Sequence, residues 1–221
     1  MADRQAKDAL YAALASAAKA LGNGHRAEIV DVLAQGERSV DALAEEIGQT
    51  VANTSHHLQL LARAGLVRTR RRGNRVIYRL AGDDVAGLWL ALRGVAVQHV
   101  AEVDVLAAAY RGRTAGVEEV RAADLAERIA DGRVVVLDVR PRAEFDAGHI
   151  AGARSAPVTE LPAGTSSSRA GSEVVAYCRG PFCVYADDAV RLLRARGVSA
   201  RRLDVGFPEW RRAGYPTTVP A

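Results

Sequence analysis

The 221-residue sequence predicts two domains, a mainly α-helical one with a β-hairpin followed by an α/β domain with a parallel sheet. Three observations support this. Up to residue 110, apolar residues recur at helical spacing between short Gly-containing breaks. Around residues 66–80, apolar and basic residues alternate instead. Beyond residue 117, continuous apolar runs appear, as in strands that are buried on both faces.

The composition is that of a packed globular protein, with 49% hydrophobic and 25% charged residues. No apolar run is long enough to predict a membrane span, and the first residues lack the pattern of a signal peptide. We therefore expect a cytoplasmic protein with no membrane partner. Thiols stay reduced in that compartment, so a close cysteine pair is expected to be reactive rather than a structural staple.

The first domain begins with helices predicted over residues 4–21 and 25–35. A third, "SVDALAEEIG", has Ser39 as its candidate N-cap and ends at Gly48. A short turn leads to a fourth helix that starts near Thr50. Two short helices joined by a tight Gly-containing turn predict a helix-turn-helix.

After Gly65 the stretch "LVRTRRRGNRVIYRL" predicts a β-hairpin that turns at Gly73–Asn74. A helix-turn-helix followed by a basic hairpin is a winged helix. Helix returns over 83–110, and its expected buried stripe is Leu88, Leu92, Val95, Val103 and Leu106.

The charge is distributed unevenly, although the net charge is only +4. Between Ile47 and Gly82 there is no Asp or Glu, and the same window holds Arg63, Arg68, Arg70, Arg71, Arg72, Arg75 and Arg79. A solvated basic face would usually mix charges of both signs. The window therefore favours a polyanionic partner, and nucleic acid first.

In the fourth helix Val51, Thr54, Leu58 and Leu61 share one face and are expected to pack inward. The opposite face would then present Ala52, Asn53, Ser55, His56 and Gln59 to base edges in a major groove. The hairpin arginines Arg70, Arg71, Arg72 and Arg75 suit phosphates or the minor groove.

The stretch 21–80, with "TSHHLQLLARAGLV" at its centre, resembles the ArsR-type bacterial repressors. The resemblance implies a homodimeric winged-helix repressor whose dimer contact is made by the helices at 4–21 and 83–110. One departure matters. Arsenic-sensing members carry a Cys-Val-Cys stretch where this sequence has Ser39 and Asp41, so thiolate ligands for arsenite are missing. His99 and Glu102 could share a metal across a dimer, but we expect no metal site.

The second domain is expected over residues 117–221, after a first domain of residues 1–111 and a boundary at "RGRTAG". Strands are predicted in "RVVVLDV", "EVVAYC" and, more weakly, "ARRLDV", with a helix in "YADDAVRLLRARG". The motifs "VVVLDVRPRAEFDAGHIAGARSAP" and "DVGFPEWRRAGYP" resemble a rhodanese domain. The resemblance implies an α/β fold and a nucleophilic, persulfide-carrying cysteine at a strand end, and Cys178 occupies that place.

The chain has two cysteines, Cys178 and Cys183, which enclose a short loop before the predicted helix. Backbone N–H groups of such a loop, together with a helix dipole, stabilise a thiolate or an anionic persulfide. Many rhodaneses have Arg where this sequence has Cys183, and Arg179 could supply part of the missing positive field. Related phosphatases have a longer loop closed by Arg, so phosphatase activity is not expected.

These features predict a DNA-binding transcriptional regulator, a repressor, that senses reactive sulfur or redox species through Cys178, Cys183 and Arg179. Its partners would be an operator, a second copy of the chain, and a sulfane-sulfur donor such as a persulfide, a polysulfide or thiosulfate, with no cofactor. Cys178 is expected to attack the sulfane sulfur first, and Cys183 to resolve the product. Alternatives remain open: a working sulfurtransferase that controls its own operon, a rhodanese domain that recruits a protein partner, or a pair of inert thiols.

Overall fold

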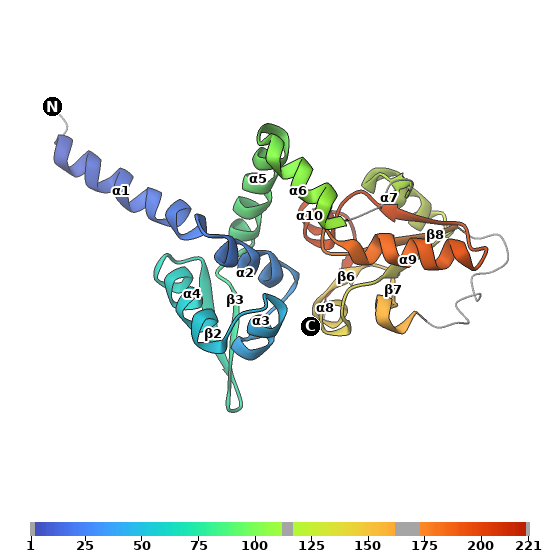
Figure 1. Ribbon diagram of the computed structural model, residues 1–221, viewed down its shortest axis with the longest axis horizontal. Coiled ribbons are helices and arrows are strands. Elements are labelled where there is room, and N and C mark those ends of the chain that lie inside the picture. The colour runs from blue at the N-terminus through green and yellow to red at the C-terminus, as the bar shows by residue number, and fades with distance from the viewer. Residues whose placement is uncertain (1–2, 112–116, 162–172, 220–221) are drawn as a thin grey trace. The chain divides into compact units, whose positions relative to one another are not determined.

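The computed structural model describes residues 3–111, 117–161 and 173–219. The chain forms two compact units, Met1–Arg93 and Gly94–Ala221 (Figure 1). The division falls inside a helix, whereas the boundary predicted from "RGRTAG" lies at residues 111–116, of which 112–116 are outside the described residues.

The first unit is a helical domain with a small antiparallel sheet of order β1-β3-β2 (Figure 1). Its elements are α1 Arg4–Leu21, α2 Gly24–Gln35, β1 Arg38–Ser39, α3 Val40–Glu46, α4 Val51–Arg63, β2 Val67–Arg72, β3 Arg75–Leu80 and the first part of α5 Asp83–His99. The helix-turn-helix is thus α3 and α4, and the wing is β2 and β3, as predicted.

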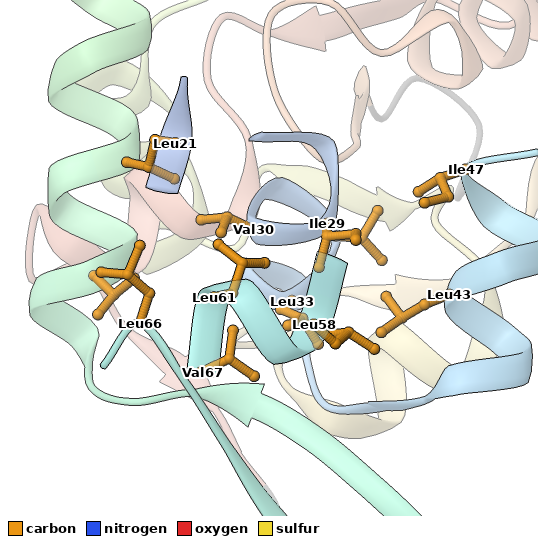
Figure 2. Packing of buried hydrophobic residues seen from close by; sticks show 12 residues of the cluster. Leu21, Ile29, Val30, Leu33, Leu43, Ile47, Leu58, Leu61, Leu66 and Val67 are labelled. Atoms are coloured by element: carbon orange, nitrogen blue, oxygen red, sulfur yellow. The ribbon is translucent and has the colours of Figure 1, made fainter. Parts of the chain in front are cut away.

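Side-chain caps explain where these helices begin. Asn23, Ser39 and Thr50 each accept a hydrogen bond from the backbone N–H three residues further on. Each cap satisfies a backbone donor that the helix itself leaves unpaired. The helices close around one apolar core, in which Leu58 and Leu61 of α4 are fully buried (Figure 2).

Three predictions for this half of the chain were wrong in detail. The helix expected over 83–110 is divided at Val100 into α5 and α6 Ala101–Arg111. Its expected buried stripe is largely exposed, at 44% for Leu92 and 58% for Leu106. Val51, expected to pack inward, is 45% exposed, because it is the first residue of α4 and precedes the turn that faces the core.

The second unit contains a five-stranded, fully parallel sheet of order β4-β9-β8-β5-β7. Its strands are β4 Glu119–Val120, β5 Val134–Asp138, β7 Arg154–Ser155, β8 Glu173–Tyr177 and β9 Ala200–Leu203. Besides the end of α5 and α6, its helices are α7 Ala122–Ala130, α8 Arg142–Ala147, the 3-10 turn η1 Val158–Glu160, α9 Val184–Ala195 and α10 Phe207–Arg212. A separate antiparallel pair joins β6 His149–Ile150 to β10 Thr217–Thr218.

Each face of this sheet has its own apolar core. One contains Ala176, Cys178 and the inner side of α9, and the other contains Tyr177, Phe207 and Trp210. The alternation follows from the strand itself, because successive residues of β8 point to opposite faces. The three predicted strands and α9 are confirmed.

In the part of the chain that the structure describes, no helix combines the length and the apolar character needed to cross a membrane.

Candidate nucleic-acid interface and cysteine loop

The reading helix α4 places the predicted base-contacting side chains on its solvent side. Thr54, Leu58 and Leu61 are buried. Ala52, Asn53, His56 and Gln59 are exposed, and Ser55 is half-buried. Because Asn53 and His56 lie three residues apart in the first two turns, they point from the same side of the helix. The described geometry thus gives α4 a polar outer face near its N-terminus.

The register of the wing gathers arginines on one face of the hairpin. Arg68 lies opposite Arg79, and Arg72 lies opposite Arg75. Arg70 shares this face, because side chains alternate along a strand, whereas Arg71 points to the other. Like charges directly opposite each other destabilise a strand pair. Such an arrangement is favourable when a polyanion neutralises it.

Among the described residues, Arg70 is the wing arginine with a carboxylate partner. Its Nε atom donates to Glu37 Oε2 at 2.7 Å, and its Nη2 atom contacts Oε1. This hydrogen bond lowers the pKa of Glu37, and the charges of Arg72 and Arg79 lower it further. The acid-free sequence window did not reveal this partner, because Glu37 precedes the window by ten positions and reaches the wing through β1, which pairs with β3.

His57 is packed at the junction of α2 and α4. Its ring centroid lies 5.7 Å from that of His25, and its Nδ1 atom is buried without a hydrogen-bond partner among the described residues. Burial lowers the pKa of His57, and the nearby charges of His25 and Arg26 add to the effect. His57 is therefore a packing residue on the inner side of the reading helix.

Apolar side chains remain exposed along α1 and α5. In α1 they include Leu10, Tyr11 and Leu14, and in α5 they include Leu88 and Leu92. The first part of α5 is held against α2 by Asp31, whose Oδ1 atom accepts from Trp89 Nε1 at 2.5 Å and from Arg93 at 3.2 Å. Exposed apolar faces of this kind mark interaction surfaces.

The cysteine loop connects the end of β8 to the start of α9. Cys178 directly follows β8 and is 2% exposed. Cys183 is the N-cap residue of α9 and is only partly buried. The two sulfurs are joined in a disulfide, with the Cα atoms 6.2 Å apart. The structure thus brings together the pair that the sequence singled out.

Backbone contacts brace this loop. Cys183 N donates to Gly180 O at 3.1 Å, which closes a turn within the loop. Phe207 N, at the start of α10, donates to Cys178 O at 3.2 Å. Gly206 packs directly on the backbone of Arg179 and Gly180. The loop is therefore fixed from the side of α10 as well as by β8 and α9.

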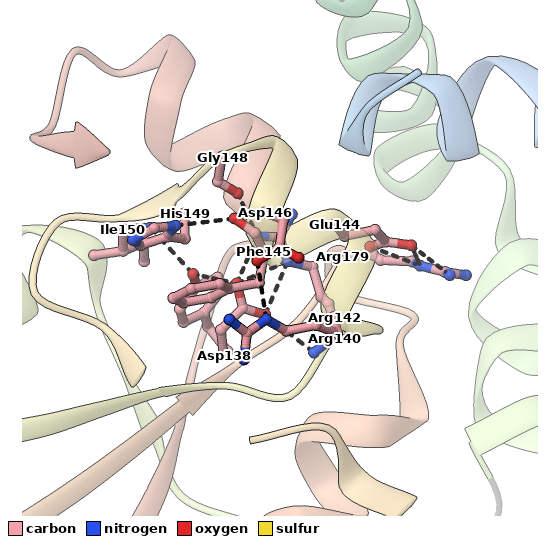
Figure 3. Close-up of polar contacts among 11 residues, drawn as sticks. Asp138, Arg140, Arg142, Glu144, Phe145, Asp146, Gly148, His149, Ile150 and Arg179 are labelled. Carbon is pink, nitrogen blue, oxygen red and sulfur yellow. Dashed lines mark hydrogen bonds and ion pairs between the residues drawn. The ribbon is translucent and has the colours of Figure 1, made fainter. Parts of the chain in front are cut away.

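Arg179 does not project freely from the loop. Its guanidinium donates to Glu144 of α8, with Nη2 to Oε1 at 2.6 Å and Nε to Oε1 at 3.0 Å (Figure 3). Glu144 is completely buried, so the charge of Arg179 is compensated by a carboxylate shielded from solvent. This partner weakens the positive field that Arg179 could offer to an anionic sulfur.

A second buried network lies beside it. Arg140 pairs with Asp138 through Nη2 to Oδ2 at 2.5 Å and also donates to Gly148 O (Figure 3). The hydroxyl of Tyr177 donates to Asp138 at 2.5 Å and accepts from Ile150 N. Burial raises the pKa of Tyr177, and the adjacent Asp138 carboxylate raises it further. This network fixes the residue immediately before Cys178.

On the other face of the sheet, one arginine connects β9, α9 and the loop. Arg202 is level with Ala176 in the sheet and is 3% exposed. Its Nη1 atom donates to Asp187 Oδ1 at 2.9 Å, and its Nη2 atom donates to Pro181 O at 3.3 Å. Asp187 lies in the first turn of α9 and is 1% exposed. Neither residue was identified from the sequence, because nothing in the local pattern marks an arginine in a strand as the partner of a helix.

Metal-ligating side chains are not gathered into a group of three anywhere in the described ranges. His99 ends α5, and Glu102 lies in the first turn of α6. Both side chains are exposed.

Comparison with known protein families assigns both halves of the chain. Residues 21–70 match a helix-turn-helix domain, and residues 121–213 match a rhodanese-like domain. Over 210 residues the chain is 45% identical to the HTH-type transcriptional regulator Rv0324 of Mycobacterium tuberculosis. That match covers 95% of this chain and 92% of the relative, so it spans both domains.

Solved structures are similar to each half separately. The homodimeric winged helix-turn-helix DNA-binding domain of Mb0332 from Mycobacterium bovis is 45% identical, with a TM-score of 0.43, and the match covers 46% of this chain and 93% of that one. The rhodanese-related protein of Thermoplasma volcanium is 27% identical, with a TM-score of 0.42, and the match covers 47% of this chain and 99% of that one.

Proposed function

The chain belongs to the HTH-type transcriptional regulators of ArsR type that carry a C-terminal rhodanese-like domain, and from this premise we propose that it is a sulfur-responsive repressor. It binds operator DNA as a homodimer through α4 and the wing. The sulfur state of Cys178 and Cys183 sets its affinity for that DNA. The proposal is supported above all by the disulfide that joins these two cysteines across the loop between β8 and α9.

DNA binding is supported by two surfaces of the first unit. The outer face of α4 offers two amides, an imidazole and small side chains, which suit base edges in a major groove. The wing offers Arg68, Arg72, Arg75 and Arg79 on one face, which suits phosphates. Arg71 points from the opposite face of the hairpin and would contact a different part of the DNA backbone.

Dimer formation is supported by the exposed apolar side chains of α1 and α5. Leu10 and Leu14 are 57% and 63% exposed, and Leu92 is exposed as well. A second copy of the chain would cover these faces symmetrically, and a C₂ dimer presents two reading helices to the two halves of an operator.

The proposed sensing reaction oxidises two thiols with one sulfane sulfur. The Cys178 thiolate attacks the outer sulfur of a persulfide RSSH, so that the S–S bond of the donor breaks and RSH leaves. Cys183 then attacks the Cys178 sulfur, the disulfide forms, and hydrogen sulfide leaves with the transferred sulfur. Two electrons pass from the thiol pair to the sulfane sulfur, and the protons of the two thiols leave with the products.

Sulfurtransferase turnover is the alternative activity of the same site. Two contacts favour sensing over efficient turnover. The last position of the loop holds a second thiol that can trap the intermediate, and the positive charge of Arg179 is engaged by Glu144. A cation free to bind an anionic donor would be expected of an efficient thiosulfate-using enzyme.

An operator gel shift with polysulfide-treated and reduced protein, paired with intact mass, tests the proposal. We expect a change in affinity that accompanies a Cys178–Cys183 crosslink, with or without added sulfur. The variant Cys183→Ser should accumulate a persulfide on Cys178, and Cys178→Ser should stay largely unmodified. Unchanged DNA binding after every treatment would instead favour a domain that recruits a protein partner. Steady conversion of thiosulfate and cyanide to thiocyanate would favour the enzyme.

A further inference from the structure

The cysteine loop has a buried acid beneath it that the proposed reaction, as described above, does not use. Asp187 is 1% exposed, and its Oδ2 atom has no hydrogen-bond partner among the described residues. A buried carboxylate oxygen without a partner is unfavourable, since it has lost its hydration without a replacement. We therefore expect this oxygen atom to have a functional role, which would explain why an unfavourable arrangement is kept.

The position of Asp187 relates it to Cys183. Cys183 is the N-cap of α9, and Asp187 follows four residues later, so the two share one side of the helix. Side chains of a helix lean toward its N-terminus, which directs the Asp187 carboxylate toward the loop.

Arg202 confirms the direction of that lean. Its guanidinium donates to Asp187 Oδ1 at 2.9 Å and to Pro181 O at 3.3 Å. One planar guanidinium thus binds both the Asp187 carboxylate and the carbonyl of Pro181, which lies two positions before Cys183. Among the described residues, Arg202 contacts Asp187 directly, and Glu119 of β4 contacts Arg202, with its Oε1 atom 3.5 Å from Arg202 Nε.

We propose that Asp187 is the proton acceptor for Cys183 during closure of the disulfide, and that Arg202 is the residue that positions it. This inference rests on the proposed function, because it assigns a step of the same reaction. When Cys183 attacks the Cys178 persulfide, the Cys183 thiol proton passes to Asp187. The new S–S bond forms as hydrosulfide leaves, and Asp187 then returns the proton to hydrosulfide or to water.

The structure also explains why this acid should be held in place. Arg202 fixes Oδ1, so that only Oδ2 remains available to a proton. Because the same guanidinium also binds the Pro181 carbonyl oxygen, it fixes the position of the Asp187 carboxylate relative to the cysteine loop. General-base assistance of this kind typically accelerates proton transfer about 10²–10⁴-fold, and acts best when the base is within hydrogen-bond reach of the proton.

The test measures the rate of disulfide closure in the full-length reduced protein, by quenched mass spectrometry, across a range of pH. Two oxidants are used in parallel, inorganic polysulfide and oxidised glutathione. We expect Asp187→Asn to close at least about tenfold more slowly with both oxidants. Added imidazole buffer should restore much of the lost rate in this variant, and should have little effect on the unaltered protein.

Asp188→Asn is the matched control, because Asp188 is the next residue of α9, carries the same charge, and pairs with Arg191 on the exposed side. It should close at the unaltered rate. If Asp187→Asn does not fold, the double variant Asp187→Asn with Arg202→Gln removes both buried charges and should show the same slow, imidazole-restored closure.

The two oxidants separate the failure of this inference from the failure of the proposed function. If polysulfide does not close the disulfide in the unaltered protein, the sensing proposal fails, and closure by oxidised glutathione still tests Asp187. Equal rates and equal pH profiles for Asp187→Asn and the unaltered protein would overturn the role of Asp187.

Discussion

Gly206 lies so close to Arg179 that a β-carbon at position 206 would stand 2.1 Å from the Arg179 carbonyl oxygen. The same β-carbon would stand 2.5 Å from Gly180 N. No side chain fits there without moving the cysteine loop away from α10. This close contact therefore requires glycine at position 206. The backbone conformation does not require it, because Gly206 is extended, as any residue can be.

We accordingly predict that Gly206→Ala destabilises the rhodanese-like domain by about 1–3 kcal/mol, the usual cost of forcing atoms into a packed site. Loss of the hydrogen bond from Phe207 N to Cys178 O would add to that cost. Thermal unfolding with intact disulfide measures the effect. Gly24→Ala is the control, because a β-carbon at Gly24 meets nothing within 4 Å. Equal stability of the two variants would contradict the prediction.

The wing arginines should contribute unequally to DNA binding. Arg72→Ala is expected to weaken binding to all sequences and to reduce the slope of log affinity against log salt by about one, since one phosphate contact is lost. Arg70→Ala should change that slope less, because Arg70 is paired with Glu37. Fluorescence anisotropy at several salt concentrations distinguishes the two variants. If Arg70→Ala and Arg72→Ala reduce the slope equally, Arg70 must leave Glu37 and bind a phosphate in the complex with DNA.

The apolar face of α5 should be required for dimer formation. Leu92→Glu places a charge among side chains that a second copy would cover, so sedimentation should show monomers, and operator affinity should fall with them. Leu192→Glu on α9 serves as the control, since Leu192 is 41% exposed and Leu92 is 44% exposed. If both variants remain dimeric, the interface lies elsewhere.

Acid should loosen the junction of α2 and α4 through His57. The pKa of His57 is lowered in the folded protein, so the unfolded chain binds the proton more readily. Stability of this junction is therefore complete above the unfolded value of about 6.5 and declines as the pH falls below it. Hydrogen exchange of α4 at pH 8 and pH 5 should show this loss in the unaltered protein and a smaller one in His57→Gln. His56→Gln, which changes the exposed neighbour, should behave like the unaltered protein.

Local pattern was sufficient to predict the helix-turn-helix, the wing, the three long strands and α9. Each of these has a periodicity or a turn signal of its own, as at Gly73–Asn74. The exposed stripe of α5 was misassigned because an apolar face has the same periodicity whether it packs within the chain or against another molecule. The short elements α8, β6 and α10 carry too few residues for a period to emerge.

The same distinction between local and long-range signals applies to the residues of the candidate sites. Cys178 and Cys183 could be identified from their spacing, since both lie in one short loop. Their supports could not. Glu144 and Arg202 come from α8 and β9, which are distant from the loop in sequence, and Asp187, although only four residues after Cys183, is paired by the distant Arg202. Glu37, the partner of Arg70, was missed for the same reason, since only strand pairing brings it to the wing.

The reading helix should control sequence preference rather than general affinity. Asn53 and His56 are exposed on the outer face of α4, whereas Arg63 lies at its C-terminal end. Asn53→Ala or His56→Ala should reduce the preference for the operator over an unrelated duplex by about 1–3 kcal/mol, because a base-edge contact is lost. Binding to the unrelated duplex should hardly change. Arg63→Ala, as the comparison, should weaken both complexes alike. Competition between the protein's own promoter and a shuffled duplex measures the difference. If Asn53→Ala and His56→Ala lose affinity equally for both duplexes, α4 contacts the backbone and the bases are read by another element.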